Sequence, residues 1–118
     1  MRLPGTALVV GLICGGAHAA DKDGNFQILG AGALKCQKLL DADKQDRLYV
    51  ETWWAGYVTG VNQTTDDTWS SVGKKSVDDV NDLIQKQCTA HPDDLIGIAV
   101  HDVLEDIYKT RTKADPNK

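Results

Sequence analysis

The chain has 118 residues, of which 42% are hydrophobic and 25% are charged, and its formal net charge is -4. This composition is typical of one small globular domain and excludes disordered, collagen-like and disulfide-dense chains. Thirteen basic residues against seventeen acidic ones leave no positive excess for neutralising phosphates, so we expect no nucleic-acid partner.

Residues 1–19 have the layout of a cleavable signal peptide. Arg2 precedes an apolar run from Ala7 to Cys14, and small residues follow up to Ala19. The run is far shorter than the roughly 20 residues of a membrane-spanning helix, and no later segment is apolar enough to span a bilayer. We therefore expect an exported protein with no membrane span, carrying twelve basic and seventeen acidic residues after cleavage.

Two cysteines, Cys36 and Cys88, remain after residue 19, and thiols become oxidised in an exported chain. Only one pairing is possible. A bridge closing a loop of about 53 residues would contribute roughly 4 kcal/mol in the chain-entropy model. The pair lacks the C-x-x-C partner of a redox or metal site, so we expect a structural disulfide.

Apolar residues recur at three- and four-residue spacing in four stretches, and no alternating strand pattern of useful length is present. The sequence therefore predicts a small all-α domain of four helices over residues 30–109. Residues 20–29 and 110–118, which are rich in charged and turn-forming residues, are expected to be flexible segments. The expected helices run from Ala31 to about Ala42, from Gln45 to about Asn62, from Ser76 to Cys88, and onward from His91-Pro92-Asp93-Asp94.

The second of these stretches is the most hydrophobic. It carries Gly56 and Gly60 four residues apart, which costs helix propensity. We expect this pair to form a smooth groove in which another helix packs closely.

The last two helices have recognisable starts. Ser76 stands three residues before Asp79, as in a capping box. Pro92 suits the first turn of a helix, and Asp93 and Asp94 would favour the positive end of its dipole. The apolar residues expected on the buried face of this last helix are Leu95, Ile96, Ala99, Val100, Val103, Leu104 and Ile107.

Four aromatic residues, Trp53, Trp54, Tyr57 and Trp69, are candidates for contact with a partner, because Trp is enriched in binding hot spots. Adjacent residues on a helix point about 100° apart, so Trp53 and Trp54 cannot face the same way. One should lie in the core, while the other covers a neighbouring helix or is available to a partner. Trp69 lies in a polar loop over residues 63–75, where it is either an exposed contact or a lid over the edge of the core.

No group of residues supports catalysis or a bound metal. Residues 21–25 resemble the start of a calcium-binding loop, but the Gly and the Glu that such a loop needs further on are missing. Cys88 and His91 are too few ligands for zinc, and His101 is expected to be a surface residue beside carboxylates such as Glu105. Nucleophile, phosphate-loop and dinucleotide motifs are also missing, so we expect no catalytic residue, no cofactor, no metal and no enzymatic activity.

Three segments together resemble the HdeA/HdeB family of small exported helical proteins and the related Tai-like immunity proteins of type VI secretion amidase effectors. They are Cys36-x-x-Leu39-Leu40, Trp54-x-Gly56-Tyr57-x-x-Gly60-Val61-Asn62 and Cys88-x-x-His91-Pro92, and the resemblance covers roughly residues 30–108. It implies a four-helix HdeA-like domain with one disulfide, located in the periplasm, whose partners are proteins. It implies no particular oligomeric state.

Two functions follow from this resemblance. An acid-stress chaperone of the HdeA/HdeB type would open at low pH and hold unfolding clients on the surface from Trp53 to Val61. The alternative is a Tai-like immunity protein that stays folded, and that binds and inhibits a secreted amidase through Trp69 and the loop carrying Asp66 and Asp67.

Overall fold

Four α-helices and two short 3-10 turns make up the structure, a computed structural model that describes residues 20–118. The expected signal peptide over residues 1–19 lies outside the described residues. In chain order the elements are η1 (Gly30–Ala33), α1 (Cys36–Leu40), α2 (Lys44–Thr64), α3 (Val77–Ala90), α4 (Ile96–Ile107) and η2 (Tyr108–Thr110). The predicted all-α class is confirmed, since the described part of the chain has no strand and only two isolated bridges.

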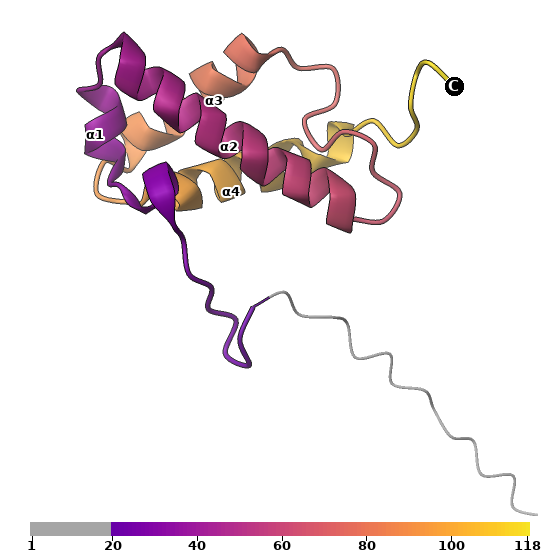
Figure 1. Ribbon diagram of the computed structural model, residues 1–118, viewed down its shortest axis with the longest axis horizontal. Coiled ribbons are helices and arrows are strands. Elements are labelled where there is room, and N and C mark those ends of the chain that lie inside the picture. The colour runs from indigo at the N-terminus through magenta and orange to yellow at the C-terminus, as the bar shows by residue number, and fades with distance from the viewer. Residues whose placement is uncertain (1–19) are drawn as a thin grey trace, which may run out of the picture.

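The longest helix, α2, runs the length of the domain, and α4 lies along it (Figure 1). η1 contacts both of these helices at one end, where α1 packs against α3. None of the helices in residues 20–118 is both long and apolar enough to cross a bilayer.

α2 and α3 both begin at a capping side chain. The Asp43 carboxylate accepts a hydrogen bond from the backbone N–H of Asp46 at 2.9 Å. Ser76 Oγ accepts from the N–H of Asp79 at 3.1 Å, and Asp79 Oδ2 accepts from the N–H of Ser76 at 2.8 Å. The predicted capping box is therefore complete, and it pairs two N–H groups that a helix start leaves without partners.

α4 begins later than predicted, at Ile96, because residues 91–95 form a turn rather than a first helical turn. The carbonyl oxygens of Pro92 and Asp94 accept hydrogen bonds from the first N–H groups of α1, at 2.9 and 2.7 Å. These acceptors face α1, and the hydrogen-bond ladder of α4 starts instead from the Leu95 carbonyl, which accepts from the N–H groups of Ile98 and Ala99. The interpretation of Asp93 and Asp94 as dipole-stabilising residues of α4 is therefore wrong.

The first predicted helix is divided in two. η1 ends at Ala33 and α1 starts at Cys36, with extended backbone at Leu34 and Lys35 between them. The Leu34 carbonyl accepts from the N–H of Ile96 at 2.8 Å, and Lys35 forms a bridge with Leu95. This pairing with the turn before α4 interrupts a stretch that has the spacing of a single helix.

The core draws one face from each of the longer helices. α4 contributes most of it, and its predicted buried face is confirmed except for Leu95, which is half-buried. The buried apolar residues are Ala31, Cys36, Leu39, Val50, Trp54, Val58, Val80, Ile84, Cys88, Ile96, Ala99, Val100, Val103, Leu104 and Ile107.

The expectation that Gly56 and Gly60 would form a close helix contact is wrong. A Cβ placed on either glycine would meet nothing within 4 Å among neighbouring atoms of the described chain. The close approaches occur at Gly32 and Gly97, where a Cβ would lie 2.1 and 3.1 Å from the Trp53 ring. The wide side chain of Trp53 fills the space between η1 and α4, and only glycine leaves enough room for it.

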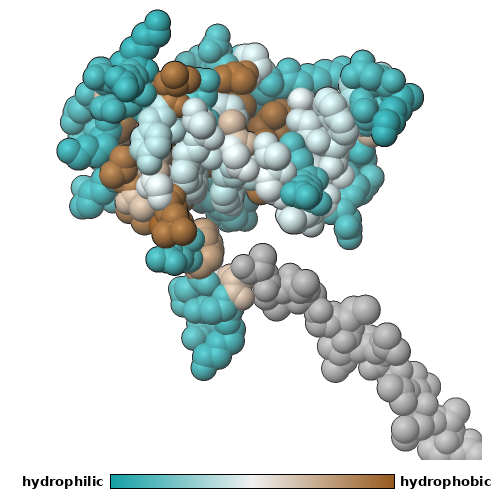
Figure 2. All heavy atoms as spheres, in the orientation of Figure 1, coloured by the Kyte–Doolittle hydropathy of each residue, from teal (hydrophilic) through white to brown (hydrophobic). Residues whose placement is uncertain are grey.

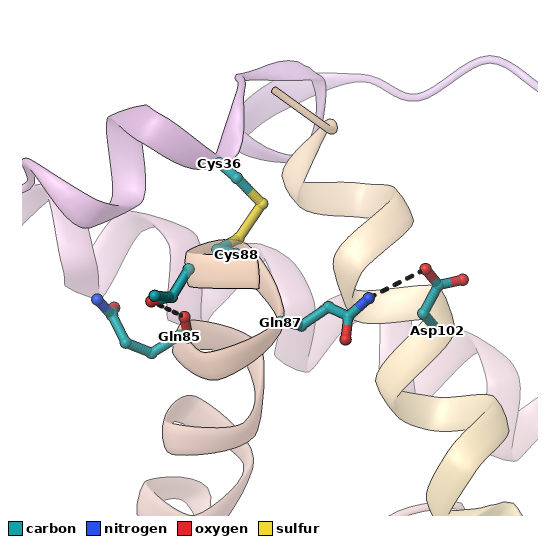
Figure 3. Close-up of a disulfide and its surroundings, with 6 residues drawn as sticks. Cys36, Gln85, Gln87, Cys88 and Asp102 are labelled. Atoms are coloured by element: carbon teal, nitrogen blue, oxygen red, sulfur yellow. Dashed lines mark hydrogen bonds between the residues drawn. A yellow bond between two sulfur atoms is a disulfide. The ribbon is translucent and has the colours of Figure 1, made fainter. Parts of the chain in front are cut away.

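The Cys36–Cys88 disulfide joins the start of α1 to the last turn of α3, as predicted (Figure 3). Both cysteines are fully buried. In the same view Gln87 reaches from α3 toward Asp102 on α4, and its Nε2 donates to Asp102 Oδ2 at 3.4 Å. The disulfide and this side-chain hydrogen bond thus add to the backbone hydrogen bonds that hold α1 against the turn before α4.

Candidate functional site

α2 presents its aromatic residues on two different faces. Trp53 and Tyr57 are four residues apart, so they share a face, and their rings stack with centroids 5.7 Å apart and an interplanar angle of 17°. Trp54 points elsewhere because it is one residue further along the helix. The three residues therefore have different access to a partner.

Trp54 belongs to the core and is 4% exposed. Its Nε1 donates to Asn81 Oδ1 at 2.8 Å, and Asn81 Nδ2 donates in turn to Glu51 Oε2 at 2.7 Å. This chain of hydrogen bonds fastens α2 to α3 and pairs the one polar atom of the indole ring. In the closed domain Trp54 has no access to a partner, so it can meet one only if these helices separate.

Trp53 is covered by the chain that precedes α1. Its Nε1 donates to the carbonyl oxygen of Leu29 at 2.6 Å, and its ring lies against Gly32 and Gly97. The contacts with both glycines were not expected from the sequence, in which neither residue forms part of a motif. The need for glycine at positions 32 and 97 becomes clear only when η1 and α4 are known to pack against the Trp53 ring.

Residues 26–29, expected to belong to a flexible segment, contact α2 and α4. A methyl carbon of Ile28 sits 2.9 Å from the position of a Cβ on Gly97, and the Phe26 ring lies 6.3 Å from the His101 ring. Figure 2 shows apolar side chains gathered where this segment joins the helices. The large apolar residues with exposed surface include Phe26, Leu29, Leu34, Leu48 and Tyr49.

A chain of three polar groups crosses from α2 to α4. The Tyr57 hydroxyl lies 3.2 Å from His101 Nδ1, and His101 Nε2 lies 3.4 Å from Glu105 Oε1. Burial raises the pKa of the Tyr57 phenol above its ordinary value, and the negative charge of Glu105 raises it further. Tyr57 therefore keeps its proton at neutral pH. The four-residue spacing of His101 and Glu105 indicated that they would be neighbours on one helix. No pattern in the sequence indicated the contact of His101 with Tyr57.

Trp69 is 46% exposed and lies on the loop between α2 and α3. The Thr112 carbonyl oxygen accepts from the Trp69 N–H at 2.9 Å, while the Asp67 carboxylate pairs with Lys113 at 3.0 Å and with Arg111 at 3.7 Å. The start of the expected C-terminal tail is thus attached to this loop. The domain boundaries at residues 30 and 109 stay predictions. Residues before 30 and after 109 also contact the helical domain.

Within residues 20–118 no three His, Cys, Asp or Glu side chains lie close enough together to hold a metal ion. The loop over residues 21–25 is a turn in which Asp21 Oδ1 accepts from the N–H groups of Asp23 and Asn25, at 2.9 and 2.8 Å. These backbone hydrogen bonds lower the pKa of Asp21, because they stabilise its charged form.

The structure is that of a small all-α domain with one buried disulfide, in which the segment before α1 contacts the aromatic face of α2. The chain belongs to the HdeA/HdeB family, whose family model matches residues 5–96. Proteins of this family are periplasmic acid-stress chaperones. The searches of curated proteins and of solved structures found no significant match.

Proposed function

We propose that this protein is a periplasmic, non-enzymatic chaperone that is closed at neutral pH and opens in acid to hold unfolding client proteins. Family membership supports this role at the level of the class. The observation that carries the proposal for this chain is that carboxylates make the polar links between its elements.

Three such links have a carboxylate as one partner. Glu51 accepts from Asn81 between α2 and α3, Asp102 accepts from Gln87 between α4 and α3, and Asp67 binds Lys113 and Arg111. A neutral carboxyl group accepts a hydrogen bond less strongly than a carboxylate and cannot form an ion pair, so links of this kind are weaker in acid as a general matter. The first of these links is made by Asn81, which also accepts the hydrogen bond from Trp54 Nε1.

Overall charge acts in the same direction. Residues 20–118 carry twelve basic and seventeen acidic side chains near neutral pH, a formal net charge of -5. Near pH 2 carboxyl groups are mostly protonated, so twelve Lys and Arg with two His would give a net charge of up to about +14. Repulsion among these charges favours an expanded state.

The disulfide limits how far the domain opens. It keeps α1 attached to α3 when the polar links are lost, while α2 and its aromatic residues can move away. Trp53, Tyr57 and the newly exposed Trp54 would then offer an apolar surface to a client. On return to neutral pH the covalent link shortens the search for the closed state.

The test is an acid titration of the exported, oxidised protein from pH 7 to pH 2. Tryptophan emission, helical circular dichroism and suppression of the aggregation of a model client are followed together. We expect the emission to shift to the red over the same pH range in which helix is lost and the client becomes protected. A fold that persists to pH 2, or one that opens without protecting the client, contradicts the proposal.

A pair of variants connects the opening to the carboxylate links. Asp102→Asn removes the charge that joins α4 to α3, so the domain should open at a higher pH than the unaltered protein. Asp106→Asn, at an exposed position on the same helix, is the matched control and should leave the pH of opening unchanged. Equal shifts for both variants would mean that net charge alone drives the opening.

The immunity function remains the second candidate, and the exposure of Trp69 is the observation that favours it. Asp66 is exposed beside this loop, so an aromatic and acidic surface is already formed in the closed domain. Tight binding of a secreted amidase at neutral pH, lost in Trp69→Ala, would establish this function in place of the first.

A further inference from the structure

Three cationic side chains line a groove of about 500 Å³ between the loop that precedes α3 and the chain from residue 110 to residue 112. Lys74 and Lys75 come from the loop, and Arg111 comes from the other side. The lining holds one carboxylate, that of Asp79, so three positive charges and one negative charge leave it at +2. Because residues 20–118 as a whole carry a formal charge of -5, this groove is a positive site on an acidic protein.

The fold holds the two sides of this groove together. The backbone groups of Ser70 and Thr112 exchange two hydrogen bonds, each 3.0 Å long, so the C-terminal segment runs beside the loop (Figure 1). Gly73 has a φ of +63°, and a Cβ at this position would overlap the carbonyl oxygen of Thr110. Only glycine allows so close an approach, which brings the two lysines to the segment that carries the arginine.

The two lysines are available to a ligand. Among residues 20–118, neither Lys74 nor Lys75 forms an ion pair. The carboxylate of Asp79 is engaged in the capping box of α3, where it accepts the backbone N–H of Ser76 at 2.8 Å. Two ammonium groups in one groove repel each other, and an anion between them would remove this cost.

Arg111 supplies positive charge and is itself held in place. Its Nη2 lies 3.7 Å from Asp67 Oδ2, and its guanidinium stacks on the Tyr108 ring at 4.3 Å from the centroid. Asp67 is not among the residues that line the groove, and it also pairs with Lys113 at 3.0 Å. The direct contacts to an anion are therefore assigned to the lysines, and Arg111 adds to the positive field.

A phosphate ester matches this groove. Its phosphate group offers negative charge and several acceptor oxygens to two ammonium groups at once, and lysine is a common phosphate ligand. The groove is larger than a phosphate group alone, and Thr110 and Thr112 on its wall suit a small polar remainder such as glycerol.

We propose that this groove binds the phosphate group of a small phosphate ester, with Lys74 and Lys75 as its direct ligands. A glycerol phosphate unit meets this description, and it occurs both as a free ester and in the headgroups of anionic lipids. The groove belongs to the closed domain, so this binding does not depend on the holding of clients in acid.

Three probes of similar size test the choice of ligand: glycerol 3-phosphate, glycerate and glycerol. Each is titrated into the exported, oxidised protein at neutral pH, and amide chemical shifts are followed by NMR. We expect saturable shifts at residues 74–79 and 110–112, with the phosphate binding most tightly, the carboxylate less tightly and the uncharged glycerol least. Added sodium chloride should weaken the binding of the phosphate, because it screens exposed charges.

Co-sedimentation with vesicles distinguishes the two sources of the phosphate. Binding to phosphatidylglycerol vesicles but not to phosphatidylcholine vesicles, without binding of free glycerol 3-phosphate, would assign the groove to a lipid headgroup. Binding of the free ester without binding to either vesicle would assign it to a soluble ligand. Both results support a phosphate site.

Variants assign the contacts. Lys74→Gln and Lys75→Gln should each weaken the bound form, free ester or vesicle, by about two- to fivefold, the range of an exposed ion pair. Lys38→Gln, at an exposed position on α1 at the other end of the domain (Figure 1), changes the net charge equally and should leave binding unaltered.

The proposal is overturned if neither glycerol 3-phosphate nor phosphatidylglycerol vesicles bind, or if the ester binds no more tightly than glycerol and the vesicles do not bind. It is equally overturned if Lys38→Gln weakens binding as much as the two groove variants do, because net charge alone would then account for the attraction.

Discussion

Asn81 is the residue on which the contact between α2 and α3 depends. Its side chain accepts from Trp54 Nε1 and donates to Glu51, so one amide group satisfies two partners on the facing helix. Such a link is worth more than either hydrogen bond alone, because removing it leaves a donor and an acceptor without partners at once.

We expect Asn81→Ala to lower the free energy of unfolding by about 1–3 kcal/mol at neutral pH, the cost of an unsatisfied polar group in a partly buried site. Urea unfolding followed by tryptophan emission measures the change. Asn117→Ala, at an exposed position near the C-terminus, is the control. A loss below a few tenths of a kcal/mol would show that water replaces Asn81 at no cost.

The sequence could predict that Trp53 and Trp54 lie on different faces of their helix, but not which of the two lies in the core. Helical geometry alone requires Trp53 and Trp54 to face different ways. Assigning Trp54 to the core needs the position of Asn81, and assigning Trp53 to the covered face needs Gly32 and Gly97. These partners are 21 to 44 residues away in the chain, beyond the reach of any local pattern.

At the scale of the elements, the sequence predicted correctly those features that depend on residues close together in the chain. The capping box of α3 spans four residues, and the sequence predicted it correctly. The predicted start of α4 was wrong, because the carbonyl oxygens of Pro92 and Asp94 accept hydrogen bonds from α1, more than fifty residues away in the chain. Their residue types are equally suited to a helix start and to a turn, so only the tertiary contact distinguishes the two.

The glycines of α2 allow a direct test of this difference between local and tertiary effects. Gly56→Ala should raise the free energy of unfolding by about 0.5–1 kcal/mol, because a Cβ there meets no neighbouring atom and alanine is the better helix former. Gly32→Ala should lower it by about 1–3 kcal/mol, since its Cβ would overlap the Trp53 ring.

Urea unfolding of both variants at neutral pH measures these opposite changes. Destabilisation by Gly56→Ala would mean that a close packing partner occupies this face of α2 in solution. A neutral effect of Gly32→Ala would mean that η1 can move away from Trp53 at little cost.

The capping box also makes α3 sensitive to acid. The backbone and side-chain hydrogen bonds from Ser76 lower the pKa of Asp79 below its ordinary value of 3.8. A carboxyl group with a lowered pKa in the folded state stabilises the fold above its unfolded pKa, and this contribution is lost as the pH falls through the folded value. The loss for Asp79 therefore falls below about pH 4.

Asp79→Asn should make stability depend less on pH between pH 5 and pH 2, because asparagine can accept the same hydrogen bond but does not titrate. Urea unfolding at a series of pH values in this range measures the slope. Asp78→Asn, the adjacent residue in the first turn of α3, is the control for net charge. An equal change of slope in the two variants would exclude a specific effect of the cap.

At the scale of the whole molecule, the sequence was sufficient for the class and for the covalent link. Helical spacing indicated the all-α domain, and the two cysteines that follow the expected signal peptide left one pairing. The sequence did not predict that residues 26–29 contact α2 and α4. The segment around them is charged and rich in turn-forming residues, and nothing in it indicates where its few apolar residues will pack.

Reduction of the Cys36–Cys88 bridge should lower the free energy of unfolding by about 4 kcal/mol, from the entropy of a loop of this length in the unfolded chain. Unfolding in urea with and without a reductant, both at neutral pH, gives the difference. The double variant Cys36→Ala, Cys88→Ala should match the reduced protein to within the cost of its lost sulfur packing. Equal stability of the oxidised and reduced forms would contradict this account.

If the chain is exported as its sequence predicts, the turn over residues 91–95 determines when its first helix can be completed. A polypeptide that crosses a membrane N-terminus first delivers Cys36 and the start of α1 well before Pro92 and Asp94, which cap that helix, and before Cys88, which pairs with it. Helix α1 therefore stays without its backbone acceptors and its disulfide partner until the C-terminal part of the chain has also crossed the membrane. Once residues 1–19 have been cleaved, Cys88 is the only cysteine left for Cys36 to pair with, so the delay carries no risk of a wrong bridge within the chain.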